Sequence, residues 1–386
     1  MQCAVSLRMP IFEFATAGRV VFGEGSVGQV PAAAAALGKR VLLVTGSTPQ
    51  RAESLRQALS GAGLSVIDFA IASEPTVDLI RRAPRDCDLV VACGGGSVLD
   101  AGKAIAALAT NPGDPMEYLE VVGQGRPLTH AAAPCIAIPT TAGTGSEVTR
   151  NAVLASTEHG VKASLRSVSM LPRIAVVDPE LTYAMLRPLT ASTGLDALTQ
   201  LIEPYLSVKA NPMTDQFCVE GIRRVARSLL RAWANGSDFE ARRDMAWASL
   251  LGGMALANAG LGAVHGFAAP VGGLFPAPHG AVCAAILPHA MRVNASAVAE
   301  RQAWKLARFD EIARLLTGRP HAIAGDAIHW LGELCARLEI PPLRTYGITL
   351  ADVPTLVEKA SQASSMKGNP LPLTPDELTE ILTASI

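Results

Sequence analysis

The sequence has few aromatic residues and little charge, and its charges nearly cancel. Aromatic side chains make up 4% of the 386 residues and charged side chains make up 17%. The 33 lysines and arginines meet 34 aspartates and glutamates, which gives a formal net charge of −1. A chain with no net basic field does not attract a polyanion. We therefore expect no nucleic-acid partner.

Paired cysteines and an export signal are also missing from the sequence. The seven cysteines are scattered and form no C-x-x-C pair. An odd number of isolated thiols is typical of a reducing compartment. Arg8 and Pro10 interrupt the stretch in which a signal peptide would need an apolar core. These features predict a cytoplasmic protein.

One apolar segment has about the length of a membrane span. Residues 245–264 contain no Asp, Glu, Lys or Arg over 20 positions, which is close to the length that a bilayer requires. Glycines and an asparagine dilute the segment, among them Gly252, Gly253 and Asn258. We therefore expect one helix buried among other helices and no membrane partner.

The apolar residues that are present divide the chain into two halves. Short buried runs alternate with helical periodicity in the first half, as in βα units with a parallel sheet. The predicted strands are residues 41–44, 89–93, 135–138 and 174–177, with helices at 49–60 and 98–109. Beyond about residue 190 the pattern is helical, most clearly at 196–207, 213–234 and 238–257. We predict an α/β domain over 1–190 and an all-helical domain over 191–386, with a cleft between them.

Two glycine-rich turns follow predicted strands. Gly95, Gly96 and Ser97 come between the second strand and a helix, where free N–H groups favour a phosphate. Residues 139–146 follow the third strand and combine two glycines with four hydroxyls. The sequence has no G-x-G-x-x-G fingerprint, but two such turns at one sheet edge indicate a nucleotide diphosphate.

The turn after the first strand bears on the choice between NAD and NADP. Residues 45–48 contain no carboxylate that could accept a hydrogen bond from a ribose 2′-hydroxyl. Ser47 and Arg51 could instead accommodate a 2′-phosphate. NADP is therefore at least as easy to bind here as NAD.

The helical half contains a candidate metal site. Asp196 and Gln200 are four residues apart and so lie on one face of a helix. His265 and His279 lie in an apolar, glycine-rich stretch with few other polar groups. Two imidazoles and a carboxylate with an open position are a common catalytic arrangement for Zn²⁺ or Fe²⁺.

These motifs together resemble the iron-dependent, or group III, alcohol dehydrogenases. The matching segments are residues 94–106, 139–149, 176–181, 193–207 and 264–280. The resemblance implies an N-terminal dinucleotide-binding α/β domain and a C-terminal all-helical domain, the architecture shared with dehydroquinate synthase. It also implies that a metal and the nicotinamide meet in the cleft, and that the chain forms a homodimer or a larger homo-oligomer.

The resemblance assigns site residues by position. The cofactor positions of the family fall on Gly46, Ser47, Gly95, Gly96, Ser97, Asp100, Thr140, Thr141, Thr144, Lys162 and Leu186. The metal positions fall on Asp196, Gln200, His265 and His279. Asp196, His265 and His279 would therefore be the catalytic set.

Three positions depart from the family pattern. Gln200 stands where relatives have a histidine ligand, and an amide oxygen is a weaker, harder donor than imidazole. Ala269 replaces an imidazole that in relatives is placed to pass a proton. Gly46 stands where relatives have an acid beside the ribose, and that acid favours NAD.

We predict an NAD(P)-dependent, metal-assisted dehydrogenase that interconverts a small-molecule alcohol with its aldehyde or ketone. Gln200 and Ala269 also fit a metal-independent reductase of the maleylacetate reductase type. A non-redox lyase resembling dehydroquinate synthase would need a basic phosphate-binding cluster. Residues 223–224 and 242–243 are interpreted instead as solvated helix faces. A nucleotide-binding protein with a decayed site is the third alternative.

Overall fold

The computed structural model describes residues 11–386, and its first half is built on a parallel sheet. Six strands pair in the order β1-β8-β5-β4-β2-β3, while β6 and β7 form a separate antiparallel hairpin. The strands are β1 (Val20–Phe22), β2 (Arg40–Thr45), β3 (Ser65–Ala70), β4 (Leu89–Gly94), β5 (Cys135–Pro139), β6 (Asn151–Ser156), β7 (Val161–Arg166) and β8 (Ile174–Val177). The carboxyl ends of β2, β4 and β5 lie side by side, because these three strands are parallel neighbours.

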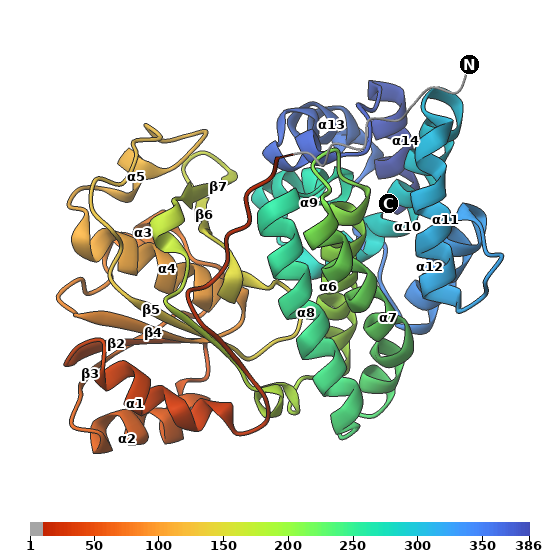
Figure 1. The fold of residues 1–386 in the computed structure, drawn as a ribbon. Helices are drawn as coiled ribbons and strands as arrows, with labels where there is room; N and C mark the ends of the chain where they lie inside the picture. The colour runs from red at the N-terminus through yellow and green to blue at the C-terminus, as the bar shows by residue number, and fades with distance from the viewer. Residues whose placement is uncertain (1–10) are drawn as a thin grey trace.

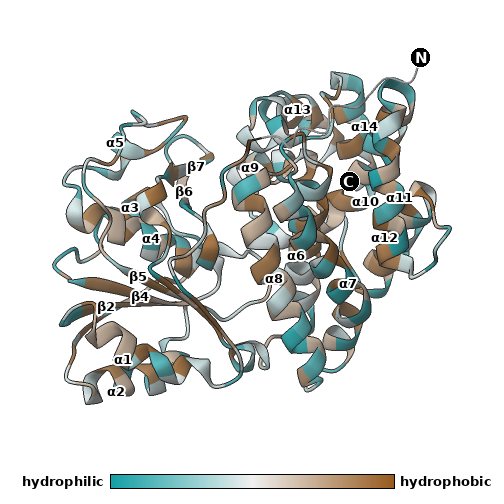
Figure 2. Ribbon diagram, viewed as in Figure 1, coloured by the Kyte–Doolittle hydropathy of each residue, from teal (hydrophilic) through white to brown (hydrophobic). Residues whose placement is uncertain are grey.

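Helices cover both faces of this sheet (Figure 1). They are α1 (Val30–Ala35), α2 (Glu53–Gly61), α3 (Val77–Arg81), α4 (Gly96–Thr110) and α5 (Pro115–Tyr118). Helices α1 and α2 bury their apolar residues on one face, and α3 and α4 bury theirs on the other. Figure 2 shows the matching hydrophobic strands in the middle of the half.

The second half is helical, as the sequence predicts. Its helices are α6 (Arg187–Leu206), α7 (Pro212–Ala234), α8 (Phe239–Ala259), α9 (Ala263–Leu274), α10 (His279–Arg301), α11 (Leu306–Thr317), α12 (Ala324–Arg337), α13 (Val353–Gln362) and α14 (Pro375–Ser385). The predicted combination of a parallel α/β half and a helical half is therefore confirmed. A domain division at residue 190 would fall within the first turn of α6, and it stays a prediction.

The apolar segment 245–264 is not the single helix that its composition predicts. Helix α8 ends at Ala259, α9 begins at Ala263, and the two axes differ by 98°. Gly260 separates them with a φ of 75°, a conformation that favours glycine. Helix α10 has the length and hydropathy of a membrane span, but 72% of its apolar window is buried inside the protein.

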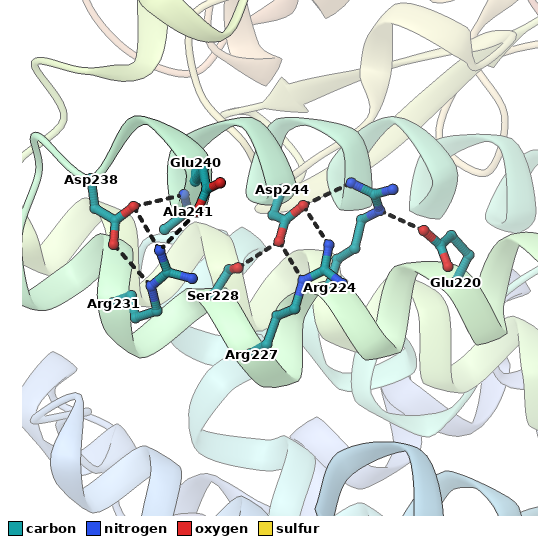
Figure 3. A network of polar contacts seen from close by, with 9 residues as sticks. All are labelled: Glu220, Arg224, Arg227, Ser228, Arg231, Asp238, Glu240, Ala241 and Asp244. Carbon is teal, nitrogen blue, oxygen red and sulfur yellow. Dashed lines mark hydrogen bonds and ion pairs between the residues drawn. The ribbon is translucent and has the colours of Figure 1, made fainter. Parts of the chain in front are cut away.

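Helices α7 and α8 are joined by a polar network (Figure 3). Asp244 accepts hydrogen bonds from Arg224, Arg227 and Ser228. Burial alone would raise the pKa of Asp244, but Arg227 and Ser228 hold it below its usual value. Arg242 was predicted to be solvated, and this is wrong for that residue: it is buried, and its guanidinium donates to Thr190 Oγ1. Arg224, Arg227 and Arg242 are therefore paired with groups inside the helical half.

Candidate active site

A cleft of about 1960 Å³ is lined by residues from both halves. The predicted site residues that line it are Gly46, Ser47, Gly95, Gly96, Ser97, Asp100, Thr141, Thr144, Lys162, Gln200, His265 and His279. Asp196 lies behind this lining and is buried. Thr140 and Leu186 are not among the lining residues. Leu186 is exposed at the start of α6, and the Thr140 N–H bonds the Gly94 carbonyl.

The two predicted phosphate turns are in contact at the carboxyl edge of the sheet. Gly95 precedes α4, whose first N–H groups have no helical partner and suit an anion. A Cβ added to Gly96 would lie 2.6 Å from Thr144 Cγ2, closer than side chains approach. Glycine is therefore required at Gly96 for the two loops to meet.

A fully buried lysine holds these loops together from behind. Lys103 Nζ lies 3.0 Å from the Ser146 carbonyl, 2.9 Å from Thr149 Oγ1 and 3.0 Å from Asp100 Oδ1. Ser146 Oγ donates to the same Asp100 oxygen over 2.5 Å, and the Val153 N–H donates to the other. The sequence analysis missed Lys103, although a lysine within a buried helix face is a signal of an internal partner.

The ribose end of the cleft is less basic than the sequence suggests. Ser47 lines the cleft, whereas Arg51 is exposed and does not line it. Lys162 also lines the cleft, but its ammonium is paired with Glu74 Oε2 over 2.5 Å. Of the two predicted 2′-phosphate contacts, Ser47 and Arg51, only Ser47 lines the cleft.

Three helices bring the predicted metal ligands together. Asp196 Oδ1, from α6, lies 3.4 Å from His265 Nε2 of α9 and 3.7 Å from His279 Nε2 of α10. Cys283 lies one turn after His279, and its Sγ is 3.7 Å from His279 Nε2. The ligand atoms of all four residues lie within 4.8 Å of one another.

The donor set fits a divalent metal. Asp196 Oδ1 is buried and has no hydrogen-bond partner in the described chain, although an orphaned carboxylate oxygen is costly. Burial would raise the pKa of Asp196, yet the facing imidazoles of His265 and His279 hold it below its usual value. The Cys283 sulfur raises the pKa of His279 to about 9. The cluster thus has a negative potential that attracts a cation.

Glu203 fixes the orientation of the first imidazole. It lies seven residues after Asp196 on the same face of α6, and its Oε2 is 2.6 Å from His265 Nδ1. Because an ionised carboxylate only accepts hydrogen bonds, His265 Nδ1 donates and Nε2 keeps its lone pair. Glu203 Oε1 also accepts from the Val264 N–H over 2.7 Å. A metal-binding histidine needs such a partner.

The three residues that depart from the family pattern, Gly46, Gln200 and Ala269, all line the cleft. Ala269 offers no group that could move a proton. Gln200 Oε1 is buried without a partner and would lie 3.7 Å from a Cβ added to Gly252 of α8. The Gln200 side chain also helps to lower the pKa of Asp196, and Cys283 of α10 is one of the four residues whose ligand atoms meet beside it.

The sequence analysis missed Glu203 and Cys283. Each lies on the same helix face as a residue that it did select, Glu203 seven after Asp196 and Cys283 four after His279. Helical spacing could have found both. That spacing does not reveal which ligand atoms meet, because three helices must first be packed together.

Known proteins resemble the chain over nearly its whole length. The family model described as iron-containing alcohol dehydrogenase matches residues 17–179, and the C-terminal model of the Fe-containing alcohol dehydrogenase family matches residues 190–386. A 1,3-propanediol dehydrogenase of Citrobacter freundii is 38% identical over 365 residues, covering 89% of this chain and 90% of that protein.

Solved structures have the same fold. A crystal structure of a 1,3-propanediol oxidoreductase matches with a TM-score of 0.90 at 35% identity, covering 98% of this chain and 100% of the other. Sulfoacetaldehyde reductase from Bifidobacterium kashiwanohense, solved in complex with NAD⁺, matches with a TM-score of 0.86 at 28% identity, covering 97% and 99%.

Proposed function

The chain belongs to the iron-containing alcohol dehydrogenase family, and from this premise we propose how its cleft performs hydride transfer. It is an NAD-dependent oxidoreductase that acts on CH–OH groups. We assign the cofactor to residues 1–190 and the metal and substrate to residues 191–386. The substrate is a small alcohol and the product its aldehyde or ketone.

The observation that carries this proposal is one cleft lined by both phosphate turns and both imidazoles. The pyrophosphate binds where Gly95, Gly96 and Ser97 open α4, because N–H groups and the helix dipole favour negative charge there. Thr141 and Thr144 line the same cleft and donate hydroxyl hydrogen bonds to the cofactor. Lys103 and Asp100 keep the two turns in register from behind.

We propose that the enzyme accepts NADPH as well as NADH. Gly46 follows β2 at the point where a carboxylate would repel a 2′-phosphate. Ser47 lines the cleft beside it and can donate to that phosphate. Arg51 does not line the cleft, so it contributes no direct contact and the preference for either cofactor is small.

Asp196, His265 and His279 would hold the divalent metal, Fe²⁺ or Zn²⁺. When bound, the metal acts as a Lewis acid that lowers the pKa of an alcohol and polarises a carbonyl. Glu203 keeps His265 Nδ1 protonated and its Nε2 free to bind. Phe275 and Pro276 line the same cleft and give it an apolar wall for the substrate.

Ala269 leaves the proton of the alcohol without an imidazole acceptor at that position. The proton therefore leaves through water in the open cleft, which His279 borders with a side chain that is 37% exposed. The relatives support the alcohol dehydrogenase and neither of the alternatives, the metal-independent reductase and the lyase.

The test is turnover of NADH and NADPH on a panel of short aldehydes and ketones, before and after chelation. We expect activity to disappear with the metal and to return with Fe²⁺ or Zn²⁺. Activity that survives complete chelation would refute the metal assignment. No turnover by fully metal-loaded enzyme would refute the substrate class.

We further propose that the protein is a cytoplasmic homodimer or larger homo-oligomer. Support for a reducing compartment comes from the six cysteines of residues 11–386, which are free thiols. Light scattering on the purified protein measures the assembly, and a monomer mass would refute it.

A further inference from the structure

Helix α10 presents two potential ligands to the same point. His279 and Cys283 are one turn apart on α10 (His279–Arg301), so both side chains project from one face. Cys283 is completely buried, and its Sγ is one of the four atoms that lie within 4.8 Å of one another. Asp196 and His265 supply the others from α6 and α9.

The spacing of these atoms is that of a coordination shell. Bonds of about 2.0–2.3 Å in a tetrahedral zinc site separate neighbouring ligand atoms by about 3.3–3.8 Å. Three of the separations are 3.4 Å and 3.7 Å from Asp196 Oδ1 to the two imidazoles, and 3.7 Å from His279 Nε2 to Cys283 Sγ. The sulfur therefore lies from His279 at the distance that separates two ligands of one metal ion.

We propose that the Cys283 thiolate is the fourth protein ligand of the metal, and that it makes up from the buried side for the histidine ligand that Gln200 replaces. This inference rests on the proposed function, because it concerns the metal assigned there to Asp196, His265 and His279. Cys283 and Asp196 bind from the buried side, since neither lines the cleft. The cleft side of the cluster stays available to substrate.

Gln200 is the competing fourth ligand, and its chemistry argues against it. Its side chain lies beside Asp196 and lines the cleft, but its amide carries no charge to offset a divalent ion. A thiolate together with the Asp196 carboxylate supplies two negative charges. Soft sulfur also favours zinc over iron more than imidazole does. We therefore expect the protein to retain zinc in preference to iron.

Cobalt substitution tests this directly, because a thiolate bound to Co²⁺ gives a near-ultraviolet charge-transfer band that nitrogen and oxygen ligands do not. Apo wild type, Cys283→Ser, Gln200→Ala and the control Cys87→Ser would each be titrated with Co²⁺. Cys87 lies in the α/β half, outside the cluster. Cys283→Ala, which keeps an apolar group at this buried site, controls for folding by circular dichroism.

Cys283→Ala is titrated in the same way. We expect the band in wild type, Cys87→Ser and Gln200→Ala, and its loss in both Cys283 variants. Their Zn²⁺ affinity, measured by competition with a chelator, should fall by more than the roughly 10–100-fold typical of an outer-shell partner. A cobalt spectrum without the charge-transfer band in wild type would overturn the Cys283 assignment but leave the metal centre intact. Failure of wild type to bind one Co²⁺ would overturn the metal centre itself.

Discussion

A close backbone approach between the two halves joins the loop of residues 139–146 to α8. Gly145 precedes the short helical turn Ser146–Val148 and has a φ of 59°, a left-handed conformation. Gly253 of α8 packs directly on it. A Cβ added at Gly253 would lie 2.7 Å from Gly145 Cα and closer still to the Gly145 carbonyl oxygen.

Gly253→Ala should therefore destabilise the protein and weaken cofactor binding. Ordinary contact begins at 3.4 Å, so Gly145 or α8 must move by about 0.7 Å to clear the Gly145 Cα and further to clear its carbonyl oxygen. Overpacking of this kind costs about 1–3 kcal/mol, against a gain of about 0.5–1 kcal/mol from helix propensity. We expect a net loss of about 1–2 kcal/mol. Displacement of Thr144, next to Gly145 and in the cleft, should raise the KM for NADH several-fold.

The matched control is Gly332→Ala, in the middle of α12. A Cβ there meets nothing within 4 Å, so the same substitution should stabilise by about 0.5–1 kcal/mol. Urea unfolding and the KM for NADH are measured for both variants. If Gly253→Ala matches Gly332→Ala in both, the two halves do not meet through this contact and the reasoning is refuted.

Three further predictions test the cofactor end of the cleft. At Gly46 an added Cβ would meet only Val98 Cγ2, at 3.6 Å, so Gly46→Asp fits without a clash. The new carboxylate should shift the ratio of kcat/KM for NADH to kcat/KM for NADPH by roughly 10–100-fold toward NADH. An unchanged ratio would mean that the ribose binds elsewhere. Lys103→Met leaves Asp100 its hydrogen bonds from Ser146 and Val153 but removes the cation that pairs with it. The change should cost about 3–5 kcal/mol in urea unfolding, part of which the added change Asp100→Asn restores; wild-type stability would contradict this. Burial raises the pKa of Glu147 to about 7 from its usual 4.5, so the folded state retains a proton and wild-type stability falls as pH rises between those values. Glu147→Gln removes this loss, and its advantage in unfolding free energy should grow to about 3 kcal/mol by pH 8; a pH-independent difference would refute the burial argument.

The strands that could be predicted are those buried on both faces. Residues 41–44, 89–93, 135–138 and 174–177 are continuous apolar runs, and each lies within an observed strand. The edge strand β3 was missed because Ser65 and Asp68 interrupt its apolar residues, one on each face of the strand. Backbone pairing with β2 holds β3 in the strand conformation, which its own apolar pattern does not predict.

Helix ends were harder to predict than helices. Helix α6 begins at Arg187, nine residues before the predicted start at Asp196. Its first turns contain threonines and serines, which have weak helix propensity, so tertiary packing decides their conformation. The same packing makes Asp196, Gln200 and Glu203 a single face of a long helix rather than the first turns of a short one.

The break between α8 and α9 explains why glycine is frequent just before His265, one of the proposed metal ligands. A Cβ at Gly262 would lie 3.0 Å from Glu203 Oε1 and 3.0 Å from Asn369 Oδ1. Any larger residue there would push Glu203 away from the Val264 N–H and from His265 Nδ1, which it binds over 2.7 Å and 2.6 Å. The bend that ends the apparent membrane-length segment thus turns α9 toward α6 and lets one carboxylate cap the helix and orient the imidazole. In the sequence this contact is visible only as a segment with little charge and much glycine. Glu203, the carboxylate that packs against Gly262, lies 59 positions earlier in the chain.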